Sequence, residues 1–267
     1  GSFKARGAFN KMLSLGPAAR AGGVIAASTG NHGAAVSYAA GKLGTSARIV
    51  VSTTADPGKV AAIRGLGGVV EAHGRDSAEA EVYARGLSQR ERVPYISPYN
   101  DRDVVAGQGT VGVELARQLP RADAVFIALG GGGLLAGVAA HLVERWPGVQ
   151  IIGCSPENSA VMVHSLRAGR ILELESQPTL SDGTAGGVEP GAITFMLCQQ
   201  YVGEMITVTE AEIRQAMGLV FQTHHLAVEG AAGVALAAYL QQVERWRGKT
   251  VVVILCGGNV SRAEFEG

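Results

Sequence analysis

The chain has 267 residues, a formal net charge of zero and 47% hydrophobic residues, which is enough for a buried core in one large or two smaller units. The neutral charge balance does not favour a nucleic-acid partner, the longest apolar runs (for example residues 251–256) are too short to cross a bilayer, and no charged leader precedes an apolar stretch. Three cysteines without a CxxC pair and six histidines without an HExxH spacing favour a cytoplasmic protein with reduced thiols and no metal site.

Short β-branched runs alternate with alanine-rich helical patterns along the chain, which predicts an α/β protein with mainly parallel sheets in three αβα layers. A first helix is expected after Ser2, which is a good N-cap. In the first hundred residues, strands are then expected at 24–27, 47–52 and 69–72, and helices at 31–42, 57–64 and 76–90.

A turn-rich stretch at 94–100 is interpreted as a boundary between lobes. Beyond it, strands are expected at 124–129, 150–154, 205–208 and 250–255, and helices at 103–118, 134–145, 160–167, 209–222, 229–243 and from Asn259 onward. Thr209 and Glu212 have the spacing of a capping box. The predicted domains are a large one, residues 1–22 and 101–267, and a small inserted one, residues 23–100.

Lys4 falls in the first turn of the first predicted helix. The positive end of the helix dipole disfavours an ammonium there, so the pKa of the amine is expected to be lowered and its neutral form favoured. A neutral, nucleophilic amine is what a Schiff-base lysine needs. Taken alone, a surface lysine near a helix start is the simpler interpretation, because such positions are only statistical pointers to function.

Two turns between a strand and a helix have the composition of anion sites. The turn Ser28-Thr29-Gly30-Asn31-His32-Gly33 offers small polar side chains beside a helix start, which suits a carboxylate, although plain helix capping explains it equally well. The tetraglycine Gly130-Gly131-Gly132-Gly133, followed by Leu134, exposes backbone N–H groups before a helix, which suits a phosphate.

The tetraglycine also allows another class of function. Gly131, Gly133 and Ala136 satisfy the G-x-G-x-x-[GA] fingerprint of a nicotinamide-dependent oxidoreductase, but no acidic residue ends the next predicted strand. A third turn, Cys256-Gly257-Gly258-Asn259, again follows a buried run. Its thiol is able to donate a weak hydrogen bond, although a cysteine in such a place is usually a small buried hydrophobe.

Together, Ser2-Phe3-Lys4-Ala5-Arg6-Gly7-Ala8, the Ser-Thr-Gly-Asn-His-Gly turn, the tetraglycine and Cys-Gly-Gly-Asn resemble the fold-type II pyridoxal-phosphate enzymes. The group resembled is that of the serine/threonine dehydratases and serine racemase, whose fold is tryptophan synthase β-like and two-lobed, and the motifs cover nearly the whole chain in the same order. The resemblance implies a helix and a strand ahead of the lysine motif, which this sequence lacks. It also implies a homodimer.

The resemblance implies a role for each motif. Lys4 would bind pyridoxal 5'-phosphate as a Schiff base and then act as the catalytic base, with Phe3 against the pyridine ring. Asn31 would hydrogen-bond the ring hydroxyl, and Ser28, Thr29 and His32 would help to hold the substrate carboxylate. Gly130 to Gly133 and Leu134 would cradle the phosphate, Cys256 would face the ring nitrogen, and Glu229 would lie near the cofactor.

The activity that the resemblance implies is elimination of the β-hydroxyl from a hydroxy amino acid, threonine or serine, to give a 2-oxo acid and ammonia. Thr29 stands where serine racemase has a serine, which favours the dehydratase over the racemase. Residues 155–161 lack carboxylates in the register expected for the racemase cation site, and the turn at 179–184 resembles an Asp-Gly segment near the active site. Dehydratases acting on hydroxyectoine-derived, 3-hydroxyaspartate or phenylserine-type substrates, and a non-catalytic homologue, remain alternatives.

Overall fold

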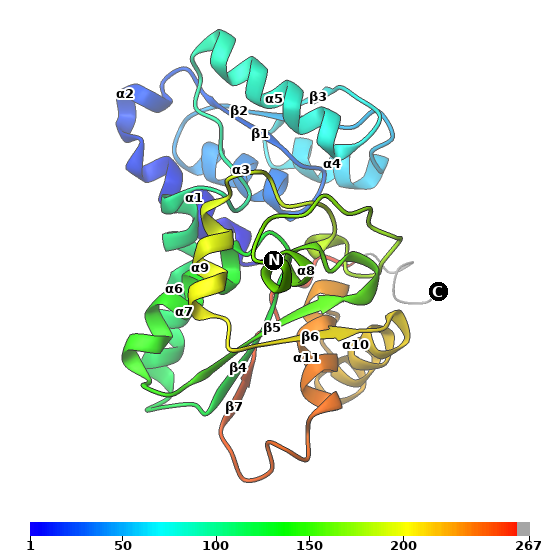
Figure 1. Cartoon of the computed structure of the whole chain (residues 1–267). Helices are drawn as coiled ribbons and strands as arrows, with labels where there is room; N and C mark the ends of the chain where they lie inside the picture. The colour runs from blue at the N-terminus through cyan, green and yellow to red at the C-terminus, as the bar shows by residue number, and fades with distance from the viewer. Residues whose placement is uncertain (261–267) are drawn as a thin grey trace. The chain divides into compact units, whose positions relative to one another are not determined.

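The computed structural model describes residues 1–260, and its contacts divide the chain into two compact units. One unit is Lys4–Gly107; the other joins Gly1–Phe3 to the chain from Gln108 onward. Each unit contains one sheet in which all strands are parallel (Figure 1). The predicted α/β class with mainly parallel sheets is therefore confirmed.

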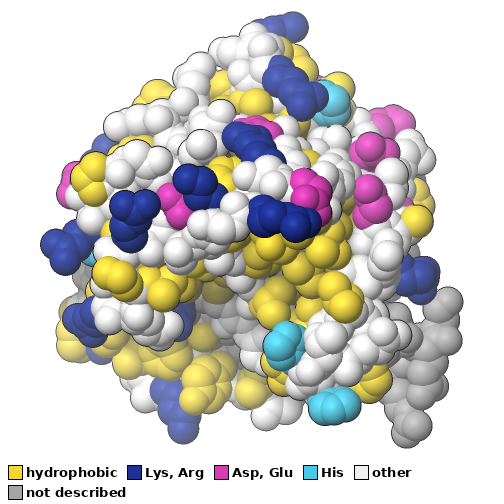
Figure 2. Space-filling model, turned by 90° about the horizontal axis from the view of Figure 1, so that it is seen from below, with side chains coloured by type: hydrophobic (Ala, Val, Ile, Leu, Met, Phe, Trp, Pro, Cys, Tyr) yellow, Lys and Arg dark blue, Asp and Glu magenta, His cyan; other side chains and the backbone are white. Residues whose placement is uncertain are grey.

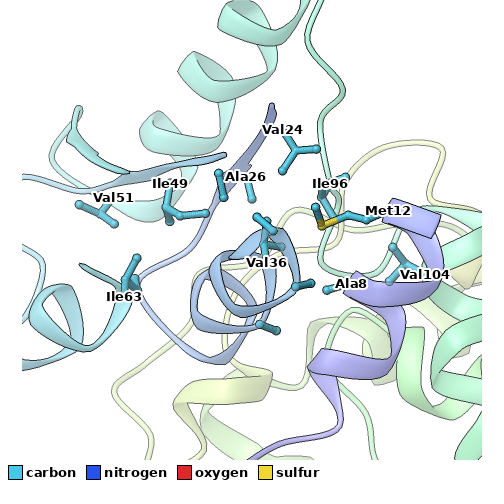
Figure 3. Close-up of a cluster of buried hydrophobic side chains, with 14 residues drawn as sticks. Ala8, Met12, Val24, Ala26, Val36, Ile49, Val51, Ile63, Ile96 and Val104 are labelled. Atoms are coloured by element: carbon cyan, nitrogen blue, oxygen red, sulfur yellow. The ribbon is translucent and has the colours of Figure 1, made fainter. Parts of the chain in front are cut away.

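In the Lys4–Gly107 unit the sheet has the order β1-β2-β3, with β1 at Val24–Ala27, β2 at Ala47–Val51 and β3 at Val69–Ala72. Successive side chains of a strand point to opposite faces. Val24 and Ala26 accordingly pack with α1 (Lys4–Ser14) and α3 (Asn31–Lys42), as Figure 3 shows. Ile25 packs on the other face against α5 (Ser77–Glu91). This unit therefore has the three layers that the sequence predicted.

Three further helices are α2 (Gly16–Arg20), which adjoins α1, α4 (Pro57–Gly65), which adjoins α3 and β3, and α6 (Arg102–Gln118), whose residues from Gln108 are grouped with the larger unit. Helix α4 starts as expected, with Pro57 in its first turn and the Asp56 carboxylate accepting a hydrogen bond from the backbone N–H of Lys59. In α6, Gly107 lies so close to α1 that an added Cβ would come 2.6 Å from the Arg6 carbonyl oxygen. Glycine at position 107 therefore lets the two helices pack closely.

In the larger unit the sheet has the order β6-β5-β4-β7, with β4 at Ala124–Ala128, β5 at Gln150–Pro156, β6 at Glu204–Val208 and β7 at Val251–Val253. Helix α11 (Gly230–Gln241) packs on one face with α10 (Glu210–His224) outside it, and α7 (Gly133–Arg145) covers the other face beside α9 (Ile193–Tyr201) (Figure 1). Helix α8 (Val161–Ala168) adjoins α9. Because helices cover both faces, β4 is wholly buried, as its apolar sequence predicts.

Several details differ from the expectations. Helices α2 and α9 were not anticipated, and the expected strand at 250–255 is reduced to Val251–Val253. The first helix begins at Lys4, and Ser2 forms an antiparallel bridge with Gly257 instead of lying next to the helix as its cap. The expected terminal helix lies outside the described residues beyond Val260, and Asn259 itself is not helical.

The contact-based division differs from the predicted domain boundaries. It groups residues 4–22 and 101–107 with the first sheet, whereas the sequence assigned them to the larger domain. We keep the predicted boundaries as a proposal only.

In residues 1–260, no helix combines the length and hydropathy needed to span a bilayer. On the face shown in Figure 2, basic and acidic side chains are interspersed with apolar ones. On that face the charges therefore form no patch of a single sign, consistent with the formal net charge of zero.

Candidate functional site

Lys4 is the first residue of α1, as the sequence predicted, and its side chain is partly buried. Its Nζ donates a hydrogen bond of 3.0 Å to the carbonyl oxygen of Pro98. Helix α1 is held in place by Ala8 and Met12, which are fully buried in the cluster of Figure 3. The amine therefore starts from a helix that is fixed by packing rather than from a mobile loop.

The Ser-Thr-Gly-Asn-His-Gly turn connects β1 to the start of α3. The Ser28 hydroxyl accepts a hydrogen bond of 3.1 Å from the Gly30 N–H, and a Cβ on Gly33 would collide with the Ser28 carbonyl oxygen. Only glycine at position 33 lets the helix begin this close to the strand end. Asn31 and His32 are the first two residues of α3, where backbone N–H groups have no acceptor within the helix. The turn therefore offers donors suited to a carboxylate.

His32 contributes to this turn differently from what the sequence suggested. Its ring is 3% exposed, and Nε2 is 2.8 Å from the carbonyl oxygen of Ile96. Burial, together with the positive charge of Lys4, lowers the pKa of His32 to about 3, so the ring is neutral. Since a carbonyl only accepts, Nε2 carries the proton and Nδ1 has none to donate. Of the proposed contacts of His32 with a carboxylate, only the one through its backbone N–H fits this geometry.

The tetraglycine lies between the end of β4 and the start of α7 in the larger unit. Gly132 has φ +85°, in the left-handed region that favours glycine. A Cβ on Gly130 would come 2.7 Å from the Thr184 carbonyl oxygen, and one on Gly132 would come 2.8 Å from the Cys198 sulfur. Because these neighbours leave no room for side chains, the loop presents bare backbone, and the N–H groups of the first turn of α7, including Leu134, add an anion site.

The Cys-Gly-Gly-Asn turn lies beside the tripeptide that precedes Lys4. The Phe3 N–H donates to the Cys256 carbonyl oxygen at 3.2 Å, and Gly258 N–H donates to the Gly1 carbonyl oxygen at 3.0 Å. Cys256 is 7% exposed. Two motifs from opposite ends of the sequence are thus paired through their backbones, and Lys4 is the next residue in the chain.

Glu229 is fixed over the same turn. Its Oε1 accepts a hydrogen bond of 2.8 Å from the Asn259 N–H, and its own N–H donates to the Gly257 carbonyl oxygen at 3.1 Å. A Cβ on Gly257 would come 2.6 Å from Oε1, so glycine is needed there to admit the carboxylate. The acidic position predicted from the sequence is therefore adjacent to the Cys-Gly-Gly-Asn turn.

The Asp-Gly turn, a short 3₁₀ helix at Asp182–Thr184, connects these elements. Thr184 packs against Gly130 of the tetraglycine. Gly183 faces the other way, where its Cβ position is 3.3 Å from the Ala231 Cβ and 3.8 Å from Glu229 Oε2. The turn therefore lies between the glycine loop and Glu229.

The structure brings the predicted residues together in two sets, one in each unit. Lys4 and the 28–33 turn belong to the Lys4–Gly107 unit, whereas the tetraglycine, Cys256 and Glu229 belong to the larger unit with Phe3. Sequence reasoning missed the carbonyl partners Ile96 and Pro98 and the residues of α9 that contact the tetraglycine. Ile96 and Pro98 lie in the turn-rich stretch that was interpreted only as a lobe boundary. A backbone acceptor leaves no signature in residue type.

Comparison with known proteins identifies relatives of the whole described chain. A family model described as "Pyridoxal-phosphate dependent enzyme" matches residues 1–257. The chain is 40% identical over 260 residues to the L-threonine ammonia-lyase of Thermotoga maritima, covering 97% of this chain and 64% of that protein. The chain thus spans less than two thirds of this curated relative.

Solved structures agree with the sequence relatives. The processed form of threonine deaminase isoform 2 from Solanum lycopersicum has a TM-score of 0.94 and 37% identity, covering 99% of this chain and 78% of that one. Maize serine racemase has a TM-score of 0.92 and 30% identity, covering 98% and 81%. Because these structures match nearly the whole chain, the similarity covers the order and arrangement of its elements as well as its α/β class.

Proposed function

Because the chain belongs to the family of pyridoxal-phosphate-dependent enzymes, whose model matches residues 1–257, we propose that it is an ammonia-lyase of hydroxy amino acids. It would eliminate the β-hydroxyl of its substrate and release a 2-oxo acid and ammonia. L-threonine is the first expected substrate and L-serine the second, since the relative at 40% identity is named an L-threonine ammonia-lyase. The observation that carries the proposal is the Phe3–Cys256 hydrogen bond, which pairs the lysine motif with the Cys-Gly-Gly-Asn turn.

The residues present fit the cofactor of the family. The tetraglycine has no space for side chains at Gly130 and Gly132, which suits a group that approaches the backbone closely, such as the cofactor phosphate. Lys4 would be the attachment point for the cofactor aldehyde, Asn31 would hydrogen-bond its ring hydroxyl, and Phe3 would pack against its ring. The Cys256 thiol would be the partner of the ring nitrogen, and Glu229 would lie near the cofactor.

Bound pyridoxal phosphate supplies an electron sink that stabilises a carbanion at the substrate α-carbon. The remaining tasks belong to side chains and backbone of this chain. Lys4 Nζ takes the α-proton as general base. The N–H groups at the start of α3, with the hydroxyls of Ser28 and Thr29, hold the substrate carboxylate and so orient the α-carbon. Neutral His32 keeps the nearby 96–98 segment in place through Ile96.

Racemisation of serine is the second candidate reaction, favoured by the similarity to maize serine racemase at 30% identity. Reprotonation on the opposite face of the α-carbon would need a donor, and Thr29 is the hydroxyl at the corresponding position. Its methyl group crowds that position compared with serine, so elimination is expected to dominate. A homodimer in the cytoplasm, with the domain boundaries given above, completes the proposal.

The experiment is reduction with borohydride in the presence of pyridoxal phosphate. Mass spectrometry of the wild-type protein is expected to find a stable adduct on Lys4. Lys4→Ala should give no adduct, and the matched control Lys249→Ala, which changes an exposed lysine, should label as the wild type does. Labelling of another lysine, or none, would contradict the cofactor assignment and favour a non-catalytic homologue.

Substrate choice is measured on the same preparation. Release of 2-oxo acid is followed with L-threonine, L-serine, 3-hydroxyaspartate and hydroxyectoine-derived substrates, and D-serine formation is followed by chiral chromatography. The expected order is threonine, then serine, with little D-serine. An adduct on Lys4 without turnover of threonine or serine would support the cofactor assignment and contradict the proposed substrates.

A further inference from the structure

Helix α9 supports the tetraglycine loop from within the larger unit. The Thr194 hydroxyl donates a hydrogen bond of 2.7 Å to the Gly131 carbonyl oxygen. The Cys198 thiol, one helical turn further, lies 3.8 Å from the Gly132 carbonyl oxygen as a weak donor. Both side chains are fully buried, so water does not compete for either contact. Two successive carbonyls of the loop are therefore held by the same face of one helix.

Holding a carbonyl also fixes the N–H of the next residue. In a planar trans peptide, C=O and N–H point in opposite directions, and the described peptide bonds are not cis. With the Gly131 oxygen directed at Thr194, the Gly132 N–H points away from α9. The Gly132 carbonyl oxygen accepts a hydrogen bond of 2.8 Å from the Ala136 N–H and also contacts the Cys198 thiol. The Gly133 N–H, on the same peptide, therefore points in the opposite direction from this oxygen. The two N–H groups are thereby oriented as donors.

The need for this anchoring follows from the composition of the loop. Four glycines lose more backbone entropy on ordering than any other tetrapeptide would, and nothing in their own side chains selects one conformation. Gly132 also packs closely on α9, with its Cβ position 2.8 Å from the Cys198 sulfur and 3.2 Å from the Thr194 Cβ. A preorganised anion site at these glycines depends on partners outside the loop.

We propose that Thr194 is a positioning residue for the phosphate of the cofactor: its hydroxyl fixes the Gly131–Gly132 peptide so that the Gly132 N–H is preorganised as a phosphate donor, with Cys198 assisting at the next peptide. This inference rests on the proposed function for the identity of the phosphate. Thr194 touches neither substrate nor cofactor and acts through the loop. Its effect is specific to ligands that carry a phosphate.

The test compares ligands that differ only in the phosphate. Dissociation constants of pyridoxal phosphate, pyridoxal and inorganic phosphate are measured for the wild type, Thr194→Val and Thr194→Ser, using absorbance for the first two and ³¹P NMR for the third. Thr194→Val keeps the shape of the side chain but lacks the donor. We expect Thr194→Val to raise the dissociation constants of pyridoxal phosphate and inorganic phosphate about tenfold, and that of pyridoxal by less than twofold. Thr194→Ser should bind the phosphate ligands almost as tightly as the wild type.

The outcomes separate the two proposals. Equal weakening of pyridoxal and pyridoxal phosphate by Thr194→Val, or no weakening of either, would overturn the role of Thr194. A wild type without an adduct on Lys4 would overturn the proposed function, while the inorganic phosphate measurement still decides the role of the loop. If Thr194→Val does not fold, Cys198→Ala provides the test, with an expected loss of about threefold for the phosphate ligands only.

Discussion

The imidazole Nε2 of His32 donates a hydrogen bond to the carbonyl oxygen of Ile96, 2.8 Å away, in a site where the ring is almost inaccessible to water. Protonation of the second nitrogen would place a charge in this buried site and next to the positive charge of Lys4. Burial is the larger cause and Lys4 the second, and together they lower the pKa of His32 to about 3. The folded protein therefore resists protonation of this ring across the mildly acidic range.

The first prediction is that His32 makes the folded state sensitive to acid. Between pH 6.5, the ordinary pKa of histidine, and about pH 3, the unfolded chain binds a proton that the folded chain does not. The free energy of unfolding should therefore fall as the pH falls through this window, by up to about 1.4 kcal/mol per pH unit from this ring. Urea denaturation at pH 7, 5.5 and 4.5 measures the slope.

The matched variant is His32→Gln, which retains an N–H donor toward Ile96 but does not titrate. Its unfolding free energy should depend less on pH than that of the wild type, and the difference removes the contribution of carboxylates common to both. Parallel slopes for the two proteins would contradict a neutral buried ring.

A second prediction concerns Gly132, whose φ is +85° and whose Cβ position is 2.8 Å from the Cys198 sulfur. Gly132→Ala adds strain of about 1–2 kcal/mol from the left-handed backbone and must also displace α9. Gly148 has the same φ of +85° with nothing within 4 Å of its Cβ position, so Gly148→Ala carries the backbone cost alone. We expect Gly132→Ala to be the less stable in thermal unfolding and the only one to weaken pyridoxal phosphate binding. Equal effects would show that the contact with α9 is unimportant.

A third prediction is that Lys11 fastens α1 to the start of α6. Its Nζ lies 2.7 Å from Asp101 Oδ2 and 3.1 Å from Asp103 Oδ2, with only 18% of the lysine side chain exposed. Burial lowers the pKa of Lys11, but hydrogen bonds and attraction to the two carboxylates outweigh it, so that the pKa is raised overall. Lys11→Met should cost about 2 kcal/mol of unfolding free energy because it leaves two carboxylates without their shared cation.

The control for Lys11→Met is an exposed ion pair. Arg247 and Glu244 are 2.7 Å apart with 77% and 75% of their side chains exposed. Arg247→Met should change the unfolding free energy by less than about 0.5 kcal/mol. A comparable loss in both variants would mean that burial does not strengthen the Lys11 cluster.

A fourth prediction concerns the capping box at the start of α10. The Glu212 N–H donates to the Thr209 hydroxyl at 3.3 Å, and the Glu212 carboxylate accepts from the Thr209 N–H at 2.8 Å. Thr209→Ala should lower the unfolding free energy by about 1 kcal/mol, whereas Thr209→Ser should retain most of it. Chemical denaturation measures both, and a neutral Thr209→Ala would mean that packing alone fixes this helix end.

Local patterns predicted the elements best where turn chemistry and apolar periodicity agree. Strand β1 at Val24–Ala27 and helix α3 at Asn31–Lys42 match the predicted bounds, because the strand is an apolar run and the helix follows a polar turn. Helix α9 at Ile193–Tyr201 was missed: it follows Ala192, has no side-chain cap, and offers only nine residues. The run at 250–255 was overextended as a strand because its residues are apolar beyond Val253, where pairing with β4 ends.

Contacts between distant segments could not be predicted from residue type. The resemblance seen in the sequence implied that Lys4, the tetraglycine and Cys256 carry the chemistry, and this grouping stays a prediction. It did not indicate that Phe3 bonds the Cys256 backbone or that Thr194 holds Gly131, because backbone acceptors are common to all residues and tertiary packing selects among them. The partner of the His32 ring, the Ile96 carbonyl oxygen, could not be predicted for the same reason.

The bridge between Ser2 and Gly257 also has a consequence for biosynthesis. Bringing together residues so far apart along the chain carries a large ordering penalty, which is met only when the intervening structure has already formed. The segment before Lys4 is synthesised ahead of the rest of the described residues, yet its bridging partner follows β7 and is synthesised near their end. Ser2 therefore acquires its bridging partner late, once nearly all of the described polypeptide has been synthesised.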